Sequence, residues 1–190
     1  MSENLMNKEF IVLGISGSPR KDGNTDIVVK KTLEIISKLR KDVKTIFLRV
    51  ADYEIKHCLG CRECMRLGEC VIKDDDFNLV LDKLLKAHLI VIGAPVFWNS
   101  PPGVMKDFID RTHGFYIDHT RLRDKKVGVI SVAAESGFES HEDVLSWLRV
   151  YGAEIVRKLR VYAREKGEVL EKSEEISKVE KFAAFLAQSF

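Results

Sequence analysis

The sequence predicts a single α/β domain built on a doubly wound parallel sheet with helices on both faces. Three observations support this prediction: strand-like apolar runs alternate with helical patterns, several of the runs are continuously apolar, and 190 residues suit one domain. Parallel neighbouring strands need a crossover between them, usually a helix, so regular alternation indicates a parallel sheet. We expect one domain over residues 1–190, because the sequence shows no internal repeat, low-complexity tract or evident linker.

The predicted strands differ in how continuous their apolar residues are. Phe10–Ile15, Leu89–Ala94 and Val127–Ala133 are uninterrupted apolar runs that end in small or polar residues. A strand covered by helices on both faces has this composition, so these three are expected at the centre of the sheet. Val43–Val50 and Ile155–Tyr162 are interrupted by charged residues and are predicted to be outer strands.

Helical patterns fill the segments between and after the strands. The predicted helices are Asp26–Arg40, Phe77–Ala87, Pro101–His113, His141–Tyr151 and Leu170–Gln188. Ser100 is placed to cap the third of these, and Ser140 to cap the fourth. Gly152 follows the fourth helix as a C-terminal stop. The charged segment Asp118–Lys126 is predicted to be a surface connection.

Composition and charge exclude some classes of protein. The net charge is only +2, and no basic stripe is interleaved with aromatic residues, so nucleic acid is not expected as a partner. No apolar run approaches the roughly 20 residues that a membrane helix needs. The segment Met1–Glu9 is polar and has no apolar signal core. We therefore expect a cytoplasmic protein with no membrane segment.

All the cysteines of the chain lie close together, at Cys58, Cys61, Cys64 and Cys70. Two successive C-x2-C steps closed by C-x5-C bring four sulfurs around one centre, and thiolates are the usual ligands of iron–sulfur clusters and zinc. A disulfide across a C-x2-C step would close a very small loop. The spacing predicts a metal site on the loop 57–71, with a cluster, a structural zinc, or free and regulatory thiols as the three interpretations.

A glycine- and serine-rich turn joins the first strand to the first helix. Gly17 and Gly23 let backbone amides approach a ligand closely, and the helix N-terminus favours an anion. The candidate side chains for holding a phosphate monoester are Ser16, Ser18, Arg20, Asn24 and Thr25. The spacing matches neither G-x-G-x-x-G nor the loop of a nucleotide triphosphatase. A turn that holds no ligand is the alternative.

The third strand ends in a proline-stiffened loop with two adjacent aromatic residues. The candidate ring-binding residues are Pro95, Val96, Phe97, Trp98 and Asn99. Aromatic side chains at the ligand end of a sheet expose apolar area unless something covers them, and a planar heteroaromatic ring is one solution. Packing on the next helix or in an oligomer interface is the other. Phosphate at one end and a flat ring at the other describe flavin mononucleotide (FMN).

These segments resemble a known family. Ser16–Arg20 with Gly23–Thr25, and Ala94–Trp98 leading into Met105–Arg111, look like the flavodoxin-fold NAD(P)H-dependent FMN reductases. The loop 57–71 is similar to the compact cysteine motif of archaeal and bacterial iron–sulfur flavoproteins. The resemblance implies a flavodoxin-like five-stranded sheet of order 2-1-3-4-5, with the cysteine-rich loop inserted after the second strand.

The resemblance also implies cofactors and an assembly. FMN would be held at its phosphate by the turn after the first strand. Its ring would lie against Pro95–Asn99 and the loop after the fourth strand, which includes Ala134 and Glu135. One [4Fe–4S] cluster would be bound by the four cysteines, in a homodimer or homotetramer. In that family the cluster of one subunit is thought to lie near the flavin of a neighbour.

The resulting expectation is an FMN-dependent oxidoreductase. A ferredoxin-like donor would supply single electrons, which pass through the cluster to FMN and on to a small-molecule acceptor such as oxygen, peroxide or a quinone. An NAD(P)H-dependent FMN or quinone reductase with a structural zinc or free-thiol loop is one alternative. A non-catalytic flavodoxin-like carrier or a zinc-stabilised interaction module is another. No side chain is assigned as a catalytic acid or base, and the histidines and Asp74–Asp76 are interpreted as structural.

Overall fold

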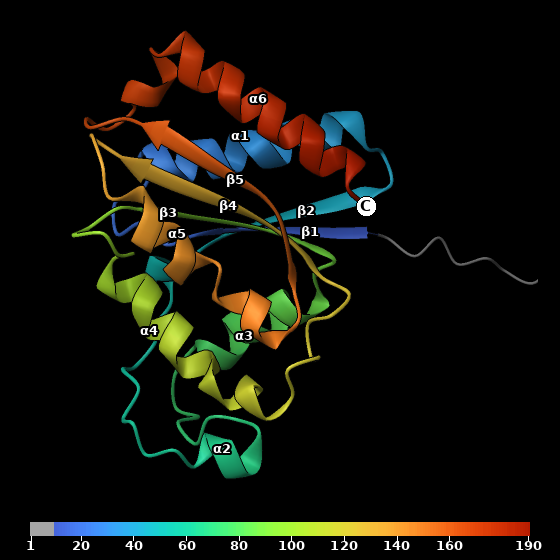
Figure 1. Ribbon diagram of the computed structural model, residues 1–190, viewed down its shortest axis with the longest axis vertical. Helices are drawn as coiled ribbons and strands as arrows, with labels where there is room; N and C mark the ends of the chain where they lie inside the picture. The colour runs from blue at the N-terminus through green and yellow to red at the C-terminus, as the bar shows by residue number, and fades with distance from the viewer. Residues whose placement is uncertain (1–9) are drawn as a thin grey trace, which may run out of the picture.

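The computed structural model describes residues 10–190, so the polar segment Met1–Glu9 and the expectation drawn from it lie outside the described residues. A five-stranded, all-parallel sheet has the order β2-β1-β3-β4-β5 (Figure 1). Its strands are β1 (Phe10–Ser16), β2 (Val43–Arg49), β3 (Leu89–Pro95), β4 (Lys126–Ala133) and β5 (Glu154–Tyr162). The predicted sheet and its strand order are confirmed.

The three continuously apolar runs form the middle of this sheet, as predicted. Strands β1, β3 and β4 are almost entirely buried, whereas the edge strands β2 and β5 keep several exposed or half-exposed residues. Gly14 of β1 shows how closely the helices approach, because an added Cβ there would lie 2.7 Å from side-chain atoms of Val29 and Leu33. The strand compositions therefore match the positions that they occupy.

Helices cover both faces of the sheet (Figure 1). The longer ones are α1 (Asn24–Leu39), α3 (Phe77–Lys86), α4 (Gly103–Arg111), α5 (Phe138–Leu145) and α6 (Ser173–Gln188). Helices α1 and α6 pack together on one face, and α3, α4 and α5 lie on the other. Short elements are α2 (Cys64–Leu67), η1 (Val50–Asp52), η2 (Thr112–Ile117), η3 (Trp147–Tyr151) and η4 (Glu168–Leu170). The short helix α2, inside the cysteine loop, was not predicted.

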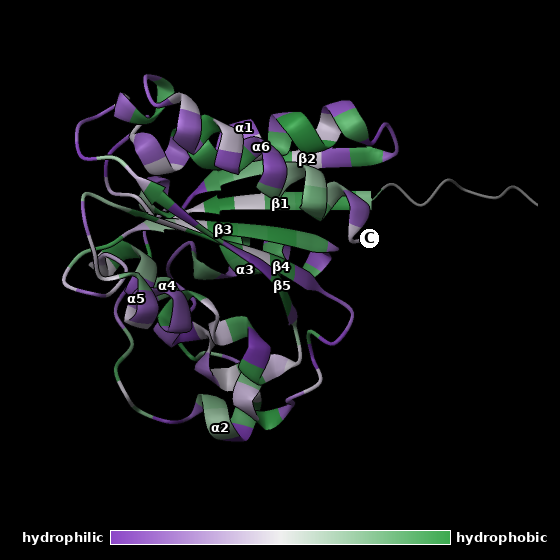
Figure 2. Cartoon of the chain, turned by 45° about the horizontal axis from the view of Figure 1, so that its top comes forward, coloured by the Kyte–Doolittle hydropathy of each residue, from purple (hydrophilic) through white to green (hydrophobic). Residues whose placement is uncertain are grey.

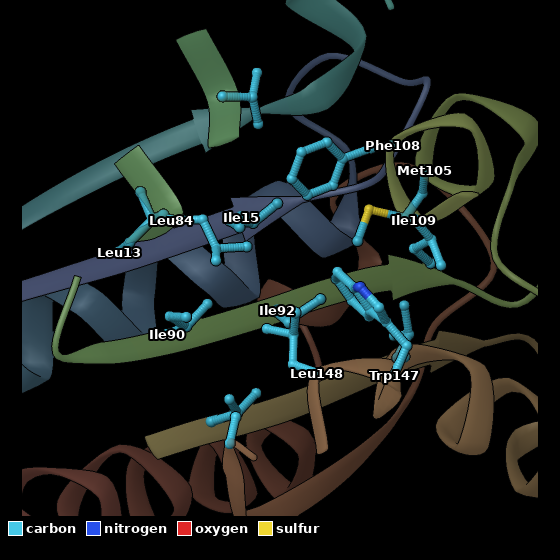
Figure 3. Close-up of a cluster of buried hydrophobic side chains, with 14 of the residues drawn as sticks. Leu13, Ile15, Leu84, Ile90, Ile92, Met105, Phe108, Ile109, Trp147 and Leu148 are labelled. Atoms are coloured by element: carbon cyan, nitrogen blue, oxygen red, sulfur yellow. The ribbon is translucent and has the colours of Figure 1, made fainter. Parts of the chain in front are cut away.

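The core consists of two apolar layers, one on each face of the sheet. In the layer under α4, Ile15 and Ile92 of the strands lie near Phe108 and Trp147 (Figure 3). Figure 2 shows apolar residues concentrated in the strands and hydrophilic ones on the outer turns of the helices. Burial of this apolar area on both faces is the main contribution that fixes the sheet.

Two predicted helix caps are wrong. Helix α4 begins at Gly103, with Pro102 as the capping residue, so Ser100 lies outside it and pairs with Phe97 across a tight turn. Helix α5 begins at Phe138, directly after Gly137, which places Ser140 inside the helix. In both cases the backbone requirements of proline and glycine, rather than a serine side chain, set the start of the helix.

Other helix ends differ in smaller ways. The predicted fourth helix breaks at Ser146 and continues as the 3-10 turn η3, after which Gly152 has φ 96° as expected for a C-terminal glycine. The last helix begins at Ser173, three residues after Leu170. The predicted surface connection after η2 is mostly exposed but buries Leu122 completely. Within residues 10–190, no helix has both the length and the apolar content that a membrane crossing requires.

Candidate functional site

The carboxyl ends of β1, β3, β4 and β5 open onto one cleft, next to the point where the strand order reverses between β1 and β3. The predicted residues that line it are Ser18, Arg20, Asn24, Thr25, Pro95, Val96, Phe97 and Ala134. Four predicted residues, Ser16, Trp98, Asn99 and Glu135, lie beside it and do not line it. The two predicted ligand loops therefore meet at one site.

Ser16 supports the phosphate loop from its buried side. It is completely buried, and its hydroxyl donates to Oδ1 of Asp26 at 2.5 Å and accepts the Ser18 amide hydrogen at 3.3 Å. The other oxygen of Asp26 accepts the amide hydrogen of Asp22, at 2.8 Å, where the backbone has φ 54°. Since the Ser16 hydrogen is already donated to Asp26, Ser16 positions the loop in this arrangement and does not reach the cleft.

Asn24 also has an unexpected role. Its amide nitrogen donates to the carbonyl of Glu165 at 2.8 Å, and its amide oxygen accepts the Val169 amide hydrogen at 3.3 Å. These bonds attach the segment after β5 to the first turn of α1. The group of Asn24 left for a ligand is its backbone amide, since the first amides of a helix have no partner within the helix.

The aromatic loop forms a tight turn with an unusual backbone. Phe97 and Ser100 exchange two backbone hydrogen bonds, of 2.8 and 3.0 Å, and the two residues between them, Trp98 and Asn99, have φ 51° and 62°. Non-glycine residues rarely adopt this left-handed conformation, which is concentrated at functional sites. Trp98 is 99% exposed. The structure thus excludes packing of Trp98 on its own following helix and keeps its ring available for a ligand or another subunit.

Gly137, directly before α5, lets this turn approach closely because it has no Cβ. Its φ is 90°, and an added Cβ would lie 2.5 Å from Oδ1 of Asn99 and 2.9 Å from Val96. We expect Gly137→Ala to displace Asn99 and to cost about 1–2 kcal/mol of stability from the left-handed backbone alone. Flavin affinity measured by fluorescence should fall with it. Gly103→Ala, where an added Cβ meets nothing at the start of α4, is the control and should lower neither stability nor flavin affinity.

His141 supports the same loop from the interior. Its ring is fully buried; Nδ1 lies 2.8 Å from the Ser131 hydroxyl and Nε2 lies 3.2 Å from the Pro95 carbonyl oxygen. Burial lowers the pKa of His141 to about 4. The neutral ring with its hydrogen on Nε2 fits both contacts, because Ser131 then donates to Nδ1 and Nε2 donates to Pro95. Its predicted structural role is consistent with these contacts.

The cysteine loop lies on the opposite side of the α3 and α4 layer from the sheet (Figure 1). The four cysteines, Cys58, Cys61, Cys64 and Cys70, all line one cavity of about 370 Å³. Aliphatic side chains of Leu59, Val71 and Ile72 line it too. Gly114 of η2 allows the loop to pack closely, since a Cβ there would lie 3.2 Å from Cβ of Cys64. Among residues 10–190, no three Cys, His, Asp or Glu side chains are grouped closely enough to hold one metal ion.

Arg111, the last residue of α4, anchors this loop and was not predicted. Its side chain is fully buried with that of Asp75, to which it donates at 2.6 Å. Its Nε donates to Sγ of Cys70 at 3.0 Å, and its other nitrogens donate to the carbonyls of Lys56 and Ile72, both at 3.0 Å. Burial acts to raise the pKa of Asp75, but the hydrogen bonds from Arg111 and from the amides of Lys56 and Phe77 lower it overall. One guanidinium therefore joins both ends of the cysteine loop.

The remaining predicted structural residues have ordinary partners. His57 lies 2.7 Å from Oδ1 of Asp107 through Nδ1, and this hydrogen bond and charge raise the pKa of His57. Asp75 accepts the amide hydrogen of Phe77 at the start of α3, at 3.1 Å, in keeping with the predicted role of the acidic run. Glu135, beside the cleft, forms an exposed ion pair with Arg164.

Three residues after β5, namely Ala163, Arg164 and Lys166, line the cleft and were missed from the sequence. The signal that could have found them is the pair of basic residues directly after the last strand, because the carboxyl ends of parallel strands share one edge. The cleft and the cysteine cavity have no lining residue in common. The molecule therefore carries two separate candidate sites.

The chain is similar to proteins of a known family. Residues 11–168 match the family described as NADPH-dependent FMN reductase. An iron–sulfur flavoprotein of Methanocaldococcus jannaschii is 37% identical over 123 residues, which are 65% of this chain and 62% of that protein. An iron–sulfur flavoprotein of Archaeoglobus fulgidus is 39% identical over 114 residues, 60% of this chain and 54% of that protein. These matches span less than two thirds of each relative's own length.

Among solved structures, a flavone reductase superposes with a TM-score of 0.76 at 18% identity, covering 95% of this chain and 62% of that one. At this identity the likeness shows the fold alone. Fold and cleft position define the class as flavodoxin-like α/β proteins. The chain belongs to the NADPH-dependent FMN reductase family. The two relatives described above are iron–sulfur flavoproteins. The resemblance inferred from the sequence is confirmed.

Proposed function

We propose that the chain is an FMN-dependent oxidoreductase that binds FMN in the cleft and a [4Fe–4S] cluster on Cys58, Cys61, Cys64 and Cys70. Electrons would pass from a ferredoxin-like donor through the cluster to FMN, and on to a small-molecule acceptor such as oxygen, peroxide or a quinone. The observation that carries the proposal is the meeting of all four thiols on one cavity, in a chain of the FMN reductase family.

The cleft residues fit FMN. The Arg20 guanidinium, which has no hydrogen-bond or ion-pair partner among residues 10–190, and the first amides of α1 are suited to its phosphate. Phe97, 45% exposed at the other end of the cleft, is suited to stacking on its ring. Ser16 and His141 would act indirectly, by fixing the phosphate loop and the aromatic turn.

The cysteine cavity supports a cluster over a zinc ion. A structural zinc takes its sulfur ligands about 2.3 Å from one point. A cavity of about 370 Å³ lined by four thiols suits a larger inorganic group. The hydrogen bond from Arg111 to Cys70 would stabilise a thiolate ligand.

The separation of the two sites supports an assembly of subunits. Because the helix layer lies between the sheet and the cysteine loop (Figure 1), we propose that the cluster of one subunit serves the FMN of another in a homodimer or homotetramer. The fully exposed ring of Trp98, beside the cleft, supports a contact between subunits at this position. Electron entry and exit would then use different faces of each subunit.

Anaerobic purification tests the proposed cofactors. The wild type should be brown, with flavin bands over a broad absorption, and should contain four iron and four sulfide per chain as the proposed cluster formula requires. Cys61→Ser should leave a yellow protein that retains FMN, because the cleft shares no residue with the cysteine cavity. Leu67→Ser, an exposed residue on the same loop that does not line the cysteine cavity, is the matched control and should stay brown.

The same samples separate the alternatives. Zinc without iron or sulfide in the wild type would remove the cluster proposal and leave a structural loop. Equal rates of flavin reduction by NADPH in the wild type and in Cys61→Ser would favour the NAD(P)H-dependent FMN or quinone reductase. Failure of every donor and acceptor pair to turn over would point to a carrier.

A further inference from the structure

The cleft has one wall that the proposed function does not use, formed by the segment after β5. Arg164 and Lys166 lie on this wall, and Arg20 lies on the phosphate loop. The cleft lining contains these three cationic residues and no Asp or Glu. A phosphate monoester carries about −1.5 to −2 charges at neutral pH, so Arg20 and the start of α1 leave room for further cationic contacts.

The segment after β5 is held rigidly over the start of α1. The Glu168 carboxylate accepts the amide hydrogens of Arg164 and Glu165, at 2.5 and 2.8 Å. These hydrogen bonds and, first of all, the one from Lys172 lower the pKa of Glu168 to about 2. The two hydrogen bonds of the Asn24 side chain, to the Glu165 carbonyl and the Val169 amide, join the segment to the first turn of α1. The two basic side chains are therefore presented from a fixed backbone.

The two basic side chains differ in the partners that they already have. Among residues 10–190, Lys166 has no hydrogen bond or close ion pair; its charge acts on the carboxylate of Asp22, which forms its own ion pair with Lys30. Arg164 pairs with Glu135, but both side chains are well exposed, at 63% and 75%, and such pairs are weak. A doubly charged phosphate competes well for Arg164, because charge-assisted bonds to a phosphate are stronger and can be bidentate.

We propose that Arg164 and Lys166 form a clamp for a phosphate ester, facing Arg20 across the cleft, with Glu135 as the carboxylate that the ester displaces. The clamp rests on the proposed binding of FMN in this cleft. The ester is either the phosphate of FMN itself or a phosphate group of a pyridine nucleotide, since both offer the same dianionic chemistry. In either case the segment after β5, and not only the loops after β1, β3 and β4, selects the ligand.

The test compares ligands with and without the phosphate on the flavin-free protein. Binding of FMN and of riboflavin is measured by flavin fluorescence, and binding of NADPH and NADH by titration. The variant Arg164→Gln/Lys166→Gln should bind FMN about 5- to 10-fold more weakly than the wild type and riboflavin equally well. If the variant instead binds NADPH about 5- to 10-fold more weakly while its affinities for NADH and FMN stay unchanged, the clamp is assigned to the pyridine nucleotide. That result also supports the proposal.

Two further variants make the result specific. Lys86→Gln/Lys181→Gln removes the same charge from exposed lysines on α3 and α6, away from the cleft, and should change none of the affinities. Glu135→Gln frees Arg164 and should strengthen binding of the clamped ligand about twofold. Its effect is opposite in sign to that of the clamp variant, which a general loss of structure cannot produce.

Two outcomes overturn the clamp. If the wild type binds FMN but the clamp variant binds FMN and NADPH as well as the wild type does, the clamp is wrong and the proposed function stands. If the wild type binds neither FMN nor riboflavin, the proposed function fails and the clamp fails with it. Thermal unfolding of each variant should match the wild type, because both residues are exposed and neither supports the core.

Discussion

Replacing Arg111 with methionine is expected to lower the free energy of unfolding by about 3–5 kcal/mol and to abolish iron uptake. The change leaves the fully buried carboxylate of Asp75 without its charge partner. An unpaired buried charge destabilises a protein far more than the removal of both partners does. It also removes the donors for the Lys56 and Ile72 carbonyls and for Sγ of Cys70, so the cysteine loop loses its attachment at both ends. Urea unfolding and the iron content of anaerobically purified protein measure the two effects.

Lys106→Met is the matched control, because it removes a cation from the same helix whose partner, Asp110, keeps 40% of its side chain exposed. It should cost less than about 1 kcal/mol and leave iron uptake intact. The double variant Arg111→Met/Asp75→Asn should recover part of the lost stability, since no buried charge is then left unpaired. If the single variant at Arg111 is no worse than Lys106→Met, the loop is held by something other than this guanidinium.

The fold could be predicted because its signals are local. Continuous apolar runs identified the central strands, and interrupted runs identified the edges, since each pattern reflects the burial of that strand alone. The role of Arg111 could not be predicted in the same way. Its partners lie 36 to 55 residues away in the sequence, and an arginine at the end of an amphipathic helix is usually solvated.

In the candidate site too, local features could be predicted and long-range contacts could not. Residue types suited to a phosphate were found in the loop after β1, and the exposure expected for the aromatic loop is confirmed at Trp98. Composition could not show which side-chain hydrogen-bond donors already have partners within the protein. Ser16 is paired ten residues away with Asp26, and Asn24 is paired 141 residues away with Glu165. Arg164 was missed because its position also depends on distant parts of the chain. It reaches the cleft only because β5 ends at the same sheet edge as β1.

Stability is expected to fall as the pH is lowered from about 6.5 to about 4, because His141 is buried in its neutral form. Its pKa is about 4 in the folded protein, against an ordinary value of 6.5, so within this window the unfolded chain binds a proton that the folded chain does not. The shift corresponds to about 3 kcal/mol of stability that is present above the window and lost at its lower end. Urea unfolding at pH 7 and at pH 4 measures the loss.

His141→Gln isolates this contribution. Glutamine keeps a donor and an acceptor for Pro95 and Ser131 but does not titrate, so the variant should lose about 3 kcal/mol less than the wild type between the two pH values. The adjacent Glu142 carboxylate acts in the opposite direction on His141 and is present in both proteins. Groups such as Glu168 and Asp42, whose pKa values lie at about 2, lose their contributions mainly below the window. Equal losses in the two proteins would mean that His141 is protonated in the folded state, and the neutral support of the aromatic turn would then be wrong.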